Sequence, residues 1–441
     1  MKVLKFGGTS VGSAQRMKDV AKLINDGEQK IVVLSAMSGT TNTLVEISDY
    51  LYKKNPEGAN EIINRLEAKY KQHIDELYST EEYKQKTLDF VKSVFDYIRS
   101  YTKDIFTLFE EKVILAQGEI ISTNMVTNYL CEQGVKAVLI PALEYMRTDK
   151  NGEPDLTYIR EKLNAQLEAN PGYEIYITQG FICRNAYGEI DNLQRGGSDY
   201  TASLIGAAIN ASEIQIWTDI DGMHDNDPRV VDKTSPVRQL HFEEAAELAY
   251  FGAKILHPTC IQPAKYANIP VRLLNTMEPS APGTLISNDT EKGKIKAVAA
   301  KDNITAIKIK SSRMLLAHGF LRKVFEIFES YQTAIDMVCT SEVGVSMSID
   351  NTKHLNEIVN DLKKYGTVTV DHDMCIVCVV GDLEWENVGF EAKALDAMRE
   401  IPVRMISFGG SNYNISFLIR EADKKRALQS LSDVLFNSDK K

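Results

Sequence analysis

The sequence predicts an α/β protein: an open sheet sandwiched by helices, followed by two smaller units of the ferredoxin-like βαββαβ type. Over the first two thirds of the chain, short apolar runs alternate with helical stretches, and several runs end in turns rich in Gly, Ser and Thr. After Lys294 the strand and helix pattern becomes shorter and repeats. A chain of 441 residues is also too long for a single core, which favours more than one domain.

We therefore expect two regions. The larger one covers residues 1–292, and a helical segment at 53–112 interrupts its strand pattern. The smaller one covers residues 293–441 and carries the two βαββαβ units, at approximately 304–372 and 373–441. An interleaved arrangement of these two units is left open.

Composition excludes several classes of function. The formal net charge of -10 argues against non-specific nucleic-acid binding. No apolar run approaches the ~20 residues that span a bilayer, and Lys2 and Lys5 interrupt the opening, so no membrane segment or leader is expected. The six scattered cysteines fit a reducing cytoplasm. Cys375 and Cys378 have C-x-x-C spacing, but their apolar surroundings favour buried strand thiols over a redox or zinc pair.

The opening strand carries a lysine and ends in glycines. Val3–Phe6 is apolar apart from Lys5, Gly7-Gly8-Thr9-Ser10 follows, and a helix is expected from Ser13 to Asn25. Glycines at a strand-to-helix turn let backbone N–H groups approach an anion, and Lys5 could reach a terminal phosphate. The alternative is an ordinary βα turn. Neither a P-loop nor a dinucleotide fingerprint is present.

A second buried strand, Lys30–Leu34, ends in another polar turn, Ser35–Asn42, before a helix from about Thr43. Because ligands bind at the carboxyl ends of such strands, both turns should open onto one crevice. The amphipathic helices expected at 53–112 are interpreted as packing and subunit contact. Beyond them we place Gly118-Glu119 near a helix start, where the dipole would stabilise the carboxylate. A simple N-terminal charge is the alternative.

A second pair of glycines lies in Arg195-Gly196-Gly197-Ser198-Asp199, before a helix expected at Tyr200–Asn210. Arg195 could clamp a carboxylate or phosphate, and Asp199 could orient a lysine or a metal–phosphate group. The alternative is a capped helix with a surface arginine. Further along, the strand Glu213–Asp219 ends in Thr218-Asp219, Lys254 lies in a loop-like segment, and His257 is interpreted as structural.

These residues together favour phosphoryl transfer. Glycine turns with lysines neutralise charge and position phosphates, and this chemistry needs no covalent group from the protein. An acceptor that is already a carboxylate also needs no general base. No Ser-His-Asp order, metal-ligand cluster or cysteine nucleophile stands out in the sequence.

Four motifs make the chain resemble the aspartate kinases of the amino-acid-kinase superfamily, nearly end to end. They are Lys-Phe-Gly-Gly-Thr-Ser (5–10), Arg-Gly-Gly-Ser-Asp-Tyr-Thr (195–201), Trp-Thr-Asp (217–219) and Phe-Gly-Ala-Lys-Ile-Leu-His-Pro (251–258). The resemblance implies ATP-dependent phosphorylation of the L-aspartate side-chain carboxylate to 4-phospho-L-aspartate. That reaction is the committed step toward lysine, threonine and methionine.

The resemblance also implies roles for single residues. Lys5 would stabilise the transferring phosphoryl group, and Asp199 would organise Lys5 and the Mg²⁺-bound ATP. Thr41 and Glu119 would contact aspartate, with Glu119 facing its amino group, and Arg195 would clamp a substrate carboxylate with help from Ser198. No side chain is assigned to a metal. The remaining nucleotide contacts would come from Gly7, Gly8, Thr9, Ser35, Thr218, Asp219, His224, Arg229 and Lys254.

His224 departs from the family pattern, because related enzymes often carry tyrosine there. The C-terminal repeats resemble ACT domains of the lysine-sensitive class, which implies feedback inhibition by L-lysine and a homodimer or larger homo-oligomer. No homoserine dehydrogenase module follows Lys441, so a monofunctional enzyme is expected. The alternative is that the residues of the implied effector site are ordinary core and turn residues of an ACT domain and bind no ligand. The effector-site residues would be Met314, Gly319, Phe320, Leu321, Asp336, Ser341 and Glu342, with Asp336 or Glu342 meeting the ammonium group.

Two rival functions stay open. One is an amino-acid kinase acting on glutamate or N-acetylglutamate, which the ACT-like tail and residues 195–201 argue against. The other is a catalytically inactive amino-acid sensor on the same scaffold. That rival requires the loss of a key charge, whereas Lys5, Asp199 and Lys254 are all present.

Overall fold

The structure is a computed structural model that describes residues 1–103, 105–193, 197–252, 256–311 and 318–437. Two compact units divide the chain: 1–223 with 255–288, and 224–254 with 289–441. Each unit is built on its own sheet, and the predicted α/β class is confirmed. None of the helices in the described ranges is long and apolar enough to cross a membrane.

The strands that the first unit contributes to a largely parallel sheet follow the order β12-β11-β7-β1-β2-β4-β3. All neighbouring strands are parallel except β12, which runs antiparallel to β11. The strands are β1 (Lys2–Phe6), β2 (Lys30–Leu34), β3 (Ala137–Leu139), β4 (Ile175–Gln179), β7 (Ile214–Thr218), β11 (Val271–Asn275) and β12 (Thr284–Ser287); β5 (Ile182–Arg184) and β6 (Ile190–Asn192) form a separate hairpin.

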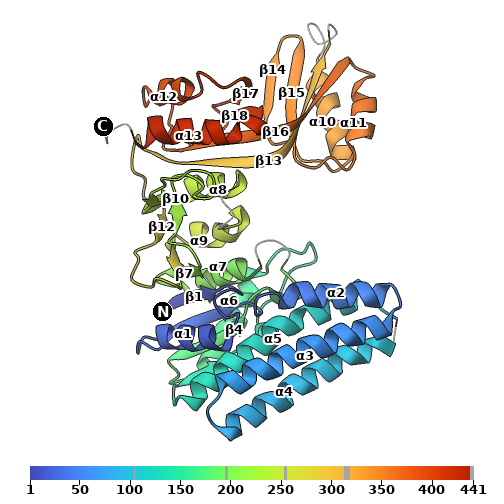
Figure 1. Cartoon of the computed structure of the whole chain (residues 1–441), viewed down its shortest axis with the longest axis vertical. Helices are drawn as coiled ribbons and strands as arrows, with labels where there is room; N and C mark the ends of the chain where they lie inside the picture. Colours follow the sequence, from blue (N-terminus) through green and yellow to red (C-terminus); the bar gives the residue numbers. More distant parts are fainter. Residues whose placement is uncertain (104, 194–196, 253–255, 312–317, 438–441) are drawn as a thin grey trace. The chain divides into compact units, whose positions relative to one another are not determined.

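Helices cover both faces of this sheet, and four long ones pack together as a bundle (Figure 1). The bundle consists of α2 (Thr40–Tyr52), α3 (Pro56–Leu77), α4 (Glu81–Ser100) and α5 (Leu108–Glu132). The amphipathic helices expected at 53–112 are thus α3, α4 and the start of α5. The other helices are α1 (Ala14–Ile24), α6 (Leu156–Ala169), α7 (Gly197–Ile209) and α9 (Gln262–Tyr266).

Strand alternation decides which way Lys5 points. Leu4 and Phe6 lie in a buried cluster with side chains of α1 and α5. Successive side chains of a strand point to opposite faces, so Lys5 points to the other face, where α7 packs against β1. The sheet therefore delivers the lysine to the beginning of α7.

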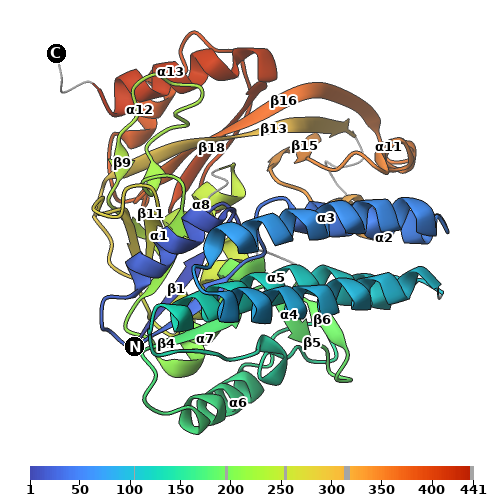
Figure 2. The ribbon, with the colours of Figure 1, turned by 60° about the horizontal axis from the view of Figure 1, so that its bottom comes forward.

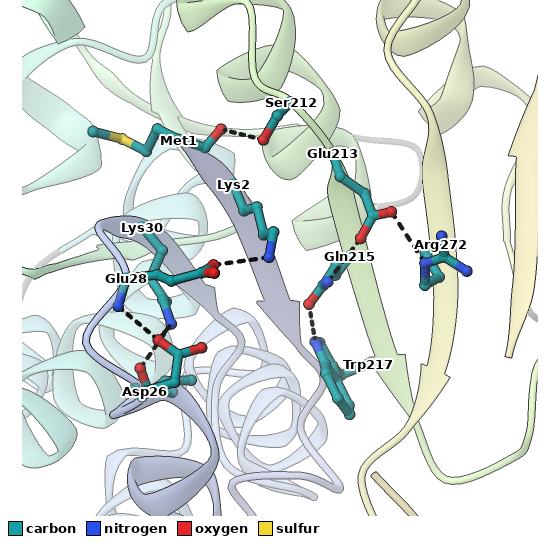
Figure 3. Close-up of polar contacts among 11 residues, drawn as sticks. Met1, Lys2, Asp26, Glu28, Lys30, Ser212, Glu213, Gln215, Trp217 and Arg272 are labelled. Atoms are coloured by element: carbon teal, nitrogen blue, oxygen red, sulfur yellow. Dashed lines mark hydrogen bonds and ion pairs between the residues drawn. The ribbon is translucent and has the colours of Figure 1, made fainter. Parts of the chain in front are cut away.

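Polar contacts tie the strands together at the opposite, amino-terminal edge of this sheet (Figure 3). Lys2 Nζ lies 2.8 Å from Glu28 Oε2, and Arg272 Nε lies 3.0 Å from Glu213 Oε2. These pairs are partly exposed and link neighbouring strands, so we interpret them as structural.

The second unit contains an antiparallel sheet of order β14-β15-β13-β16-β18-β17, in which β13 and β16 are long and curved (Figure 2). The first half of β13 pairs with the second half of β16, and the second half of β13 with the first half of β16. The two long strands therefore run antiparallel along their whole length, and the predicted bounds of the two βαββαβ units stay predictions. The strands are β13 (Ile295–Lys310), β14 (Val338–Ser341), β15 (Gly344–Ile349), β16 (Thr367–Gly381), β17 (Val403–Ser407) and β18 (Asn414–Arg420).

The helices of the second unit are α8 (Phe242–Tyr250), α10 (Phe320–Ser330), α11 (Leu355–Leu362), α12 (Phe390–Ala397) and α13 (Lys424–Leu435). Cys375 and Cys378 are buried and free on β16, as predicted for strand thiols. Short strands β8 (Met223–His224), β9 (Pro236–Val237) and β10 (Gln239–His241) complete the chain.

Residues 224–254 belong to the second unit, although they precede the last strands of the first. Val231 packs in a core cluster with side chains of β16 and β18, and Asn226 Nδ2 donates to the Leu428 carbonyl oxygen at 3.0 Å. The hydrogen bond joins residues 202 positions apart, and the core contacts of Val231 also join distant segments, for which the sequence pattern carries no signal.

Candidate active site

A pocket of about 340 Å³ lies at the carboxyl ends of β1, β2 and β4. This is the edge at which parallel sheets bind ligands, and the two polar turns predicted to share a crevice both line it. The lining residues are Gly8, Ser35, Ala36, Met37, Ser38, Gly39, Thr41, Asn42, Glu119, Phe181, Gly197 and Ser198.

The turns after β1 and β2 are in direct contact. Ser38 N donates to the Gly8 carbonyl oxygen at 3.1 Å, and a Cβ added to Gly8 would lie only 2.9 Å from Ala36 O. Any side chain at position 8 would push the turns apart. This glycine is therefore needed for close approach of two backbone segments.

The beginning of α7 is held against the end of β4 in the same way. A Cβ on Gly180 would lie 2.4 Å from Ser198 Cβ. Phe181, whose φ of 70° is in the left-handed region, donates its N–H to Thr201 Oγ1 at 2.9 Å. These contacts bring Ser198 and Asp199 to the mouth of the β1 turn.

Lys5 and Asp199 form an ion pair there. Lys5 Nζ lies 2.7 Å from Asp199 Oδ1, and the two side chains are only 11% and 16% exposed. Asp199 lies in the first turn of α7, where the helix dipole stabilises a carboxylate. The predicted pairing of these two residues thus has direct geometric support.

Two serines extend this arrangement toward the second turn. Ser35 Oγ donates to Ser198 Oγ at 2.9 Å, and Ser122 Oγ donates to the Ser35 carbonyl oxygen at 2.8 Å. The end of β2 is thereby linked to α7 on one side and α5 on the other.

Cys260, in the same unit, is buried, and burial raises the pKa of its thiol to about 12, which keeps the thiol neutral.

Glu119 lies in the middle of α5, so its expected placement near a helix start is wrong, and so is the dipole account. α5 begins at Leu108 because Thr107 and Glu110 form a capping box, a signal well upstream of Gly118-Glu119. Glu119 is 3% exposed. Burial raises its pKa to about 8, with the Ala36 N–H acting in the opposite direction.

The two oxygens of Glu119 have different surroundings. Oε1 accepts a hydrogen bond from Ala36 N at 3.2 Å, whereas Oε2 is buried and has no hydrogen-bond partner among the described residues. Glu119 also lines the pocket. A buried carboxylate oxygen without a partner is costly in the free protein, and a ligand cation would relieve that cost.

Gly118 explains how this carboxylate reaches the pocket. A Cβ at position 118 would lie 2.8 Å from Ala36 Cβ and 3.3 Å from Thr40 Cγ2. The missing side chain lets α5 approach the turn after β2, which brings Glu119 alongside Ala36.

Thr41, predicted to contact aspartate, lines the pocket in the first turn of α2. Thr218 and Asp219 follow β7 in the same unit: Thr218 is partly buried and Asp219 is exposed. Gly7 and Thr9 belong to the β1 turn, where the Thr9 carbonyl oxygen accepts from Arg16 Nη1 at 2.7 Å. Their predicted nucleotide contacts stay predictions.

The other predicted nucleotide residues belong to the second unit. His224 Nδ1 lies 2.9 Å from Thr234 Oγ1. Arg229 is exposed and pairs through Nε and Nη2 with the two carboxylate oxygens of Asp227, at 2.9 Å each. Arg195 and Lys254, like Met314 of the predicted effector site, lie outside the described residues.

Asp336 of the predicted effector site has partners from its own chain. Its side chain is 2% exposed, and Oδ1 accepts from Tyr250 Oη at 2.8 Å and from Lys301 Nζ at 2.7 Å. Oδ2 is buried and lacks a hydrogen-bond partner within the described part of the chain.

The other effector candidates have mixed surroundings. Phe320 packs in a core cluster with Val324 and Phe328, which fits a packing role. Gly319 precedes α10 with a left-handed φ of 85°, and Leu321 is 38% exposed. Ser341 and Glu342 are exposed at the end of β14.

Some pocket residues were given no role from the sequence, among them Met37, Asn42 and Phe181. Asn42 ends the polar turn that the sequence predicts at Ser35–Asn42, so the sequence contains a usable signal for its place in the pocket. Phe181 follows a strand that was predicted to end in a small polar turn, but nothing in the sequence marks an aromatic residue as a pocket wall.

Comparison with known proteins identifies relatives along the whole chain. Residues 1–275 match the amino acid kinase family, and residues 377–435 match the ACT domain. Aspartokinase 1 of Arabidopsis thaliana, a chloroplastic protein, is 35% identical over 99% of this chain and 80% of its own length. Lysine-sensitive aspartokinase 3 of Escherichia coli is 32% identical over 98% of this chain and 99% of its own length.

Solved structures show the same likeness. Escherichia coli aspartokinase III in complex with aspartate and ADP (R-state) superposes with a TM-score of 0.83 at 31% identity, covering 99% of this chain and 100% of the other. The same enzyme in complex with lysine and aspartate (T-state) gives a TM-score of 0.81 at 32% identity, covering 99% of both chains.

Proposed function

This chain belongs to the aspartokinases of the amino acid kinase family, and we propose that it transfers the terminal phosphoryl group of ATP to the side-chain carboxylate of L-aspartate. The product is 4-phospho-L-aspartate. The reaction serves amino-acid biosynthesis, as the first step toward lysine, threonine and methionine.

The observation that carries the proposal is the unpartnered Oε2 of Glu119 in the pocket beside the Lys5–Asp199 pair. An α-ammonium group would complete the hydrogen bonding of that oxygen and stabilise the carboxylate form. The uncapped first turn of α2, with Thr41, supplies N–H and hydroxyl donors suited to a substrate carboxylate. Arg195 keeps its proposed role as a second carboxylate clamp.

Lys5 acts on the phosphoryl group. Its ammonium is held at the glycine turn by Asp199, in a largely buried place where charge is weakly screened. As the phosphoryl group moves from ATP to the acceptor, negative charge develops on its oxygens, and a fixed cation stabilises that charge. The acceptor is already ionised, so its attack requires no base.

ATP is the phosphoryl donor, and we propose that Mg²⁺ accompanies it. The cation neutralises charge on the phosphates in kinases generally. Asp199 offers a hard carboxylate oxygen of the kind that Mg²⁺ prefers, in the first turn of α7. Gly7, Gly8, Thr9, Ser35, Thr218, Asp219, His224, Arg229 and Lys254 keep their proposed roles in nucleotide binding.

ADP release from MgATP with L-aspartate, L-glutamate and N-acetyl-L-glutamate as acceptors tests the proposal. We expect turnover with L-aspartate. Turnover only with a glutamate-type acceptor would support the rival kinase, and no turnover with any acceptor would support the inactive sensor.

We further propose that L-lysine inhibits the enzyme through the second unit. Asp336 already receives one ammonium group, that of Lys301. Its buried second oxygen leaves a place for another cation, and the ε-ammonium of L-lysine has the matching chemistry. Inhibition then requires that lysine bind the inactive arrangement more tightly than the active one.

We also propose that the enzyme is a homodimer or a larger homo-oligomer and that it works in a reducing cytoplasm.

A further inference from the structure

A buried hydroxyl pair connects the helical bundle to the pocket. Tyr70 on α3 and Thr40 at the start of α2 are each 1% exposed, and their hydroxyl oxygens lie 2.9 Å apart in hydrogen-bonding contact. The Tyr70 ring packs at 5.9 Å from the Phe95 ring on α4. α2 and α3 run side by side over this stretch (Figure 2).

The hydrogen bond between Tyr70 and Thr40 fixes the orientation of the two side chains more than it stabilises the fold. A hydrogen bond between two buried neutral groups adds little net stability, and two apolar groups of the same shape would pack about as well. Leaving one hydroxyl without its partner is costly, so the pair holds both side chains in a single orientation. Burial raises the pKa of Tyr70, which keeps the phenol protonated and the contact intact at ordinary pH.

Thr40 is the first residue of α2, and the residues after it form one wall of the pocket. Gly39 precedes it with a left-handed φ of 82°, and no side chain caps the helix. Thr40 N donates to the Met37 carbonyl oxygen at 3.0 Å, so the first-turn N–H groups left for a ligand are those of Thr41 and Asn42, and both residues line the pocket. The direction of this turn decides where those donors point.

Thr40 also lies against the opposite wall. Its Cγ2 is the atom that a Cβ on Gly118 would approach at 3.3 Å, one residue before Glu119. A change in the Thr40 rotamer would alter the spacing between the first turn of α2 and the turn of α5 that carries Glu119.

The neighbouring residue of α3 makes a second link to the same turn. Lys69 Nζ donates to the Ser38 carbonyl oxygen at 3.3 Å, on the exposed side. Two adjacent residues of α3 thus hold the segment 38–40 from its outer and inner sides.

We propose that Tyr70 is a positioning residue for acceptor binding: through Thr40 it fixes the first turn of α2 relative to Glu119. This inference rests on the proposed function, because it assumes that the pocket receives the amino-acid acceptor. The sequence alone indicates only packing and subunit contact for the segment 53–112. If Tyr70 positions the pocket, this segment also affects the affinity for the acceptor.

Steady-state kinetics of Tyr70→Phe, which keeps the ring and removes the hydroxyl, test the proposal. We expect KM for L-aspartate to rise about five- to tenfold, while KM for MgATP stays within about twofold of wild type. Thr40→Val should behave like Tyr70→Phe, and the double variant should be no worse than either single one because both remove the same contact. Thr40→Ser keeps a hydroxyl and should retain most of the wild-type affinity.

Tyr78→Phe is the matched control. The Tyr78 hydroxyl is also buried and donates to the Met125 carbonyl oxygen at 2.7 Å, but Tyr78 does not line the pocket. Tyr78→Phe should lower the melting temperature by about as much as Tyr70→Phe does, while KM for both substrates stays unchanged. A KM for L-aspartate within twofold of wild type in both Tyr70→Phe and Thr40→Val, or an equal rise with Tyr78→Phe, would overturn the proposal.

Wild-type turnover separates this test from the test of the proposed function. If the wild type turns over a different acceptor, the proposed substrate is wrong, and the same comparison is made with that acceptor. If the wild type turns over none, calorimetric titration of the same variants with L-aspartate decides whether Tyr70 affects acceptor affinity.

Discussion

Lys5 Nζ lies 2.7 Å from Asp199 Oδ1, and this ion pair joins the glycine turn after the first strand to the first turn of α7. The residues are far apart in sequence, and each is placed by local structure: Lys5 by strand alternation, Asp199 by the close contact of Gly180 with Ser198. The pair is the centre of the proposed phosphoryl-transfer site.

Lys5→Met should lower kcat by roughly 10²–10³, because it removes the fixed cation that stabilises charge on the transferring phosphoryl group. KM for L-aspartate should change much less. Stopped assays of ADP release measure both values, and circular dichroism checks the fold.

Lys2→Met is a matched control for that variant. Lys2 is on the same strand and also forms an ion pair, with Glu28, but at the opposite edge of the sheet (Figure 3). Its kcat should stay within about twofold of wild type, since partly exposed pairs contribute little. Equal losses in the two lysine variants would indicate damage to the strand instead of to the chemistry.

Glu119→Gln should raise KM for L-aspartate by about 10- to 100-fold, because it removes the charge that pairs with the substrate ammonium. In the wild type, burial raises the pKa of Glu119 to about 8, so most of the free enzyme carries a neutral acid near neutrality. KM for L-aspartate should therefore fall as the pH rises from 6.5 toward 8.5. Glu119→Gln should lose that dependence, and a variant that kept it would assign the titration to another group.

The same carboxyl group should affect the stability of the ligand-free protein. Its pKa of about 8 in the folded state exceeds 4.5, the ordinary value, so the folded form holds the proton more tightly than the unfolded chain. This contribution to stability is fully present below pH 4.5 and is lost as the pH rises through 8. Glu119→Gln should then melt at a higher temperature than wild type at pH 8.5, with a smaller difference at pH 6. No difference at either pH would contradict the buried, unpaired state of the carboxylate.

Gly8→Ala should lower kcat/KM by at least about tenfold. The added Cβ would lie 2.9 Å from the Ala36 carbonyl oxygen, so the two turns must separate, and a small misplacement of reacting groups is costly. Gly410→Ala is the control, because a Cβ there meets nothing within 4 Å. Unchanged kinetics in Gly8→Ala would show that the turns need not touch.

Asp336→Asn should relieve inhibition by L-lysine while leaving uninhibited kcat close to wild type. The change removes the charge that a ligand ammonium would meet. Asp361→Asn, which disrupts a surface pair with Lys364, should keep full lysine sensitivity. Dose–response curves for lysine measure both, and unchanged sensitivity in Asp336→Asn would remove this residue from the effector site.

Local sequence was enough to predict much of the site. The β1 turn, the polar turn after β2 and the Ser198-Asp199 helix start each combine a strand end with glycines and charged or hydroxyl side chains, and all three meet at the pocket. The class of fold followed from the same alternation of strands and helices.

The remaining features depend on contacts between distant segments. The sequence predicts Glu119 near a helix start, whereas it lies in the middle of α5, and Gly118 serves close packing of that helix on Ala36. The Tyr70–Thr40 pair and the grouping of residues 224–254 with the second sheet likewise join segments whose pairing no periodicity encodes. Helical periodicity marks Tyr70 as buried, but it cannot say which hydroxyl it meets.

The most direct test of the account is ADP release by the wild-type enzyme from MgATP and L-aspartate, with and without millimolar L-lysine. The account predicts turnover that requires L-aspartate and that lysine suppresses. Turnover that lysine leaves unchanged would keep the kinase and reject the effector proposal. Absence of turnover with L-aspartate, with ATP in excess, would contradict the central claim.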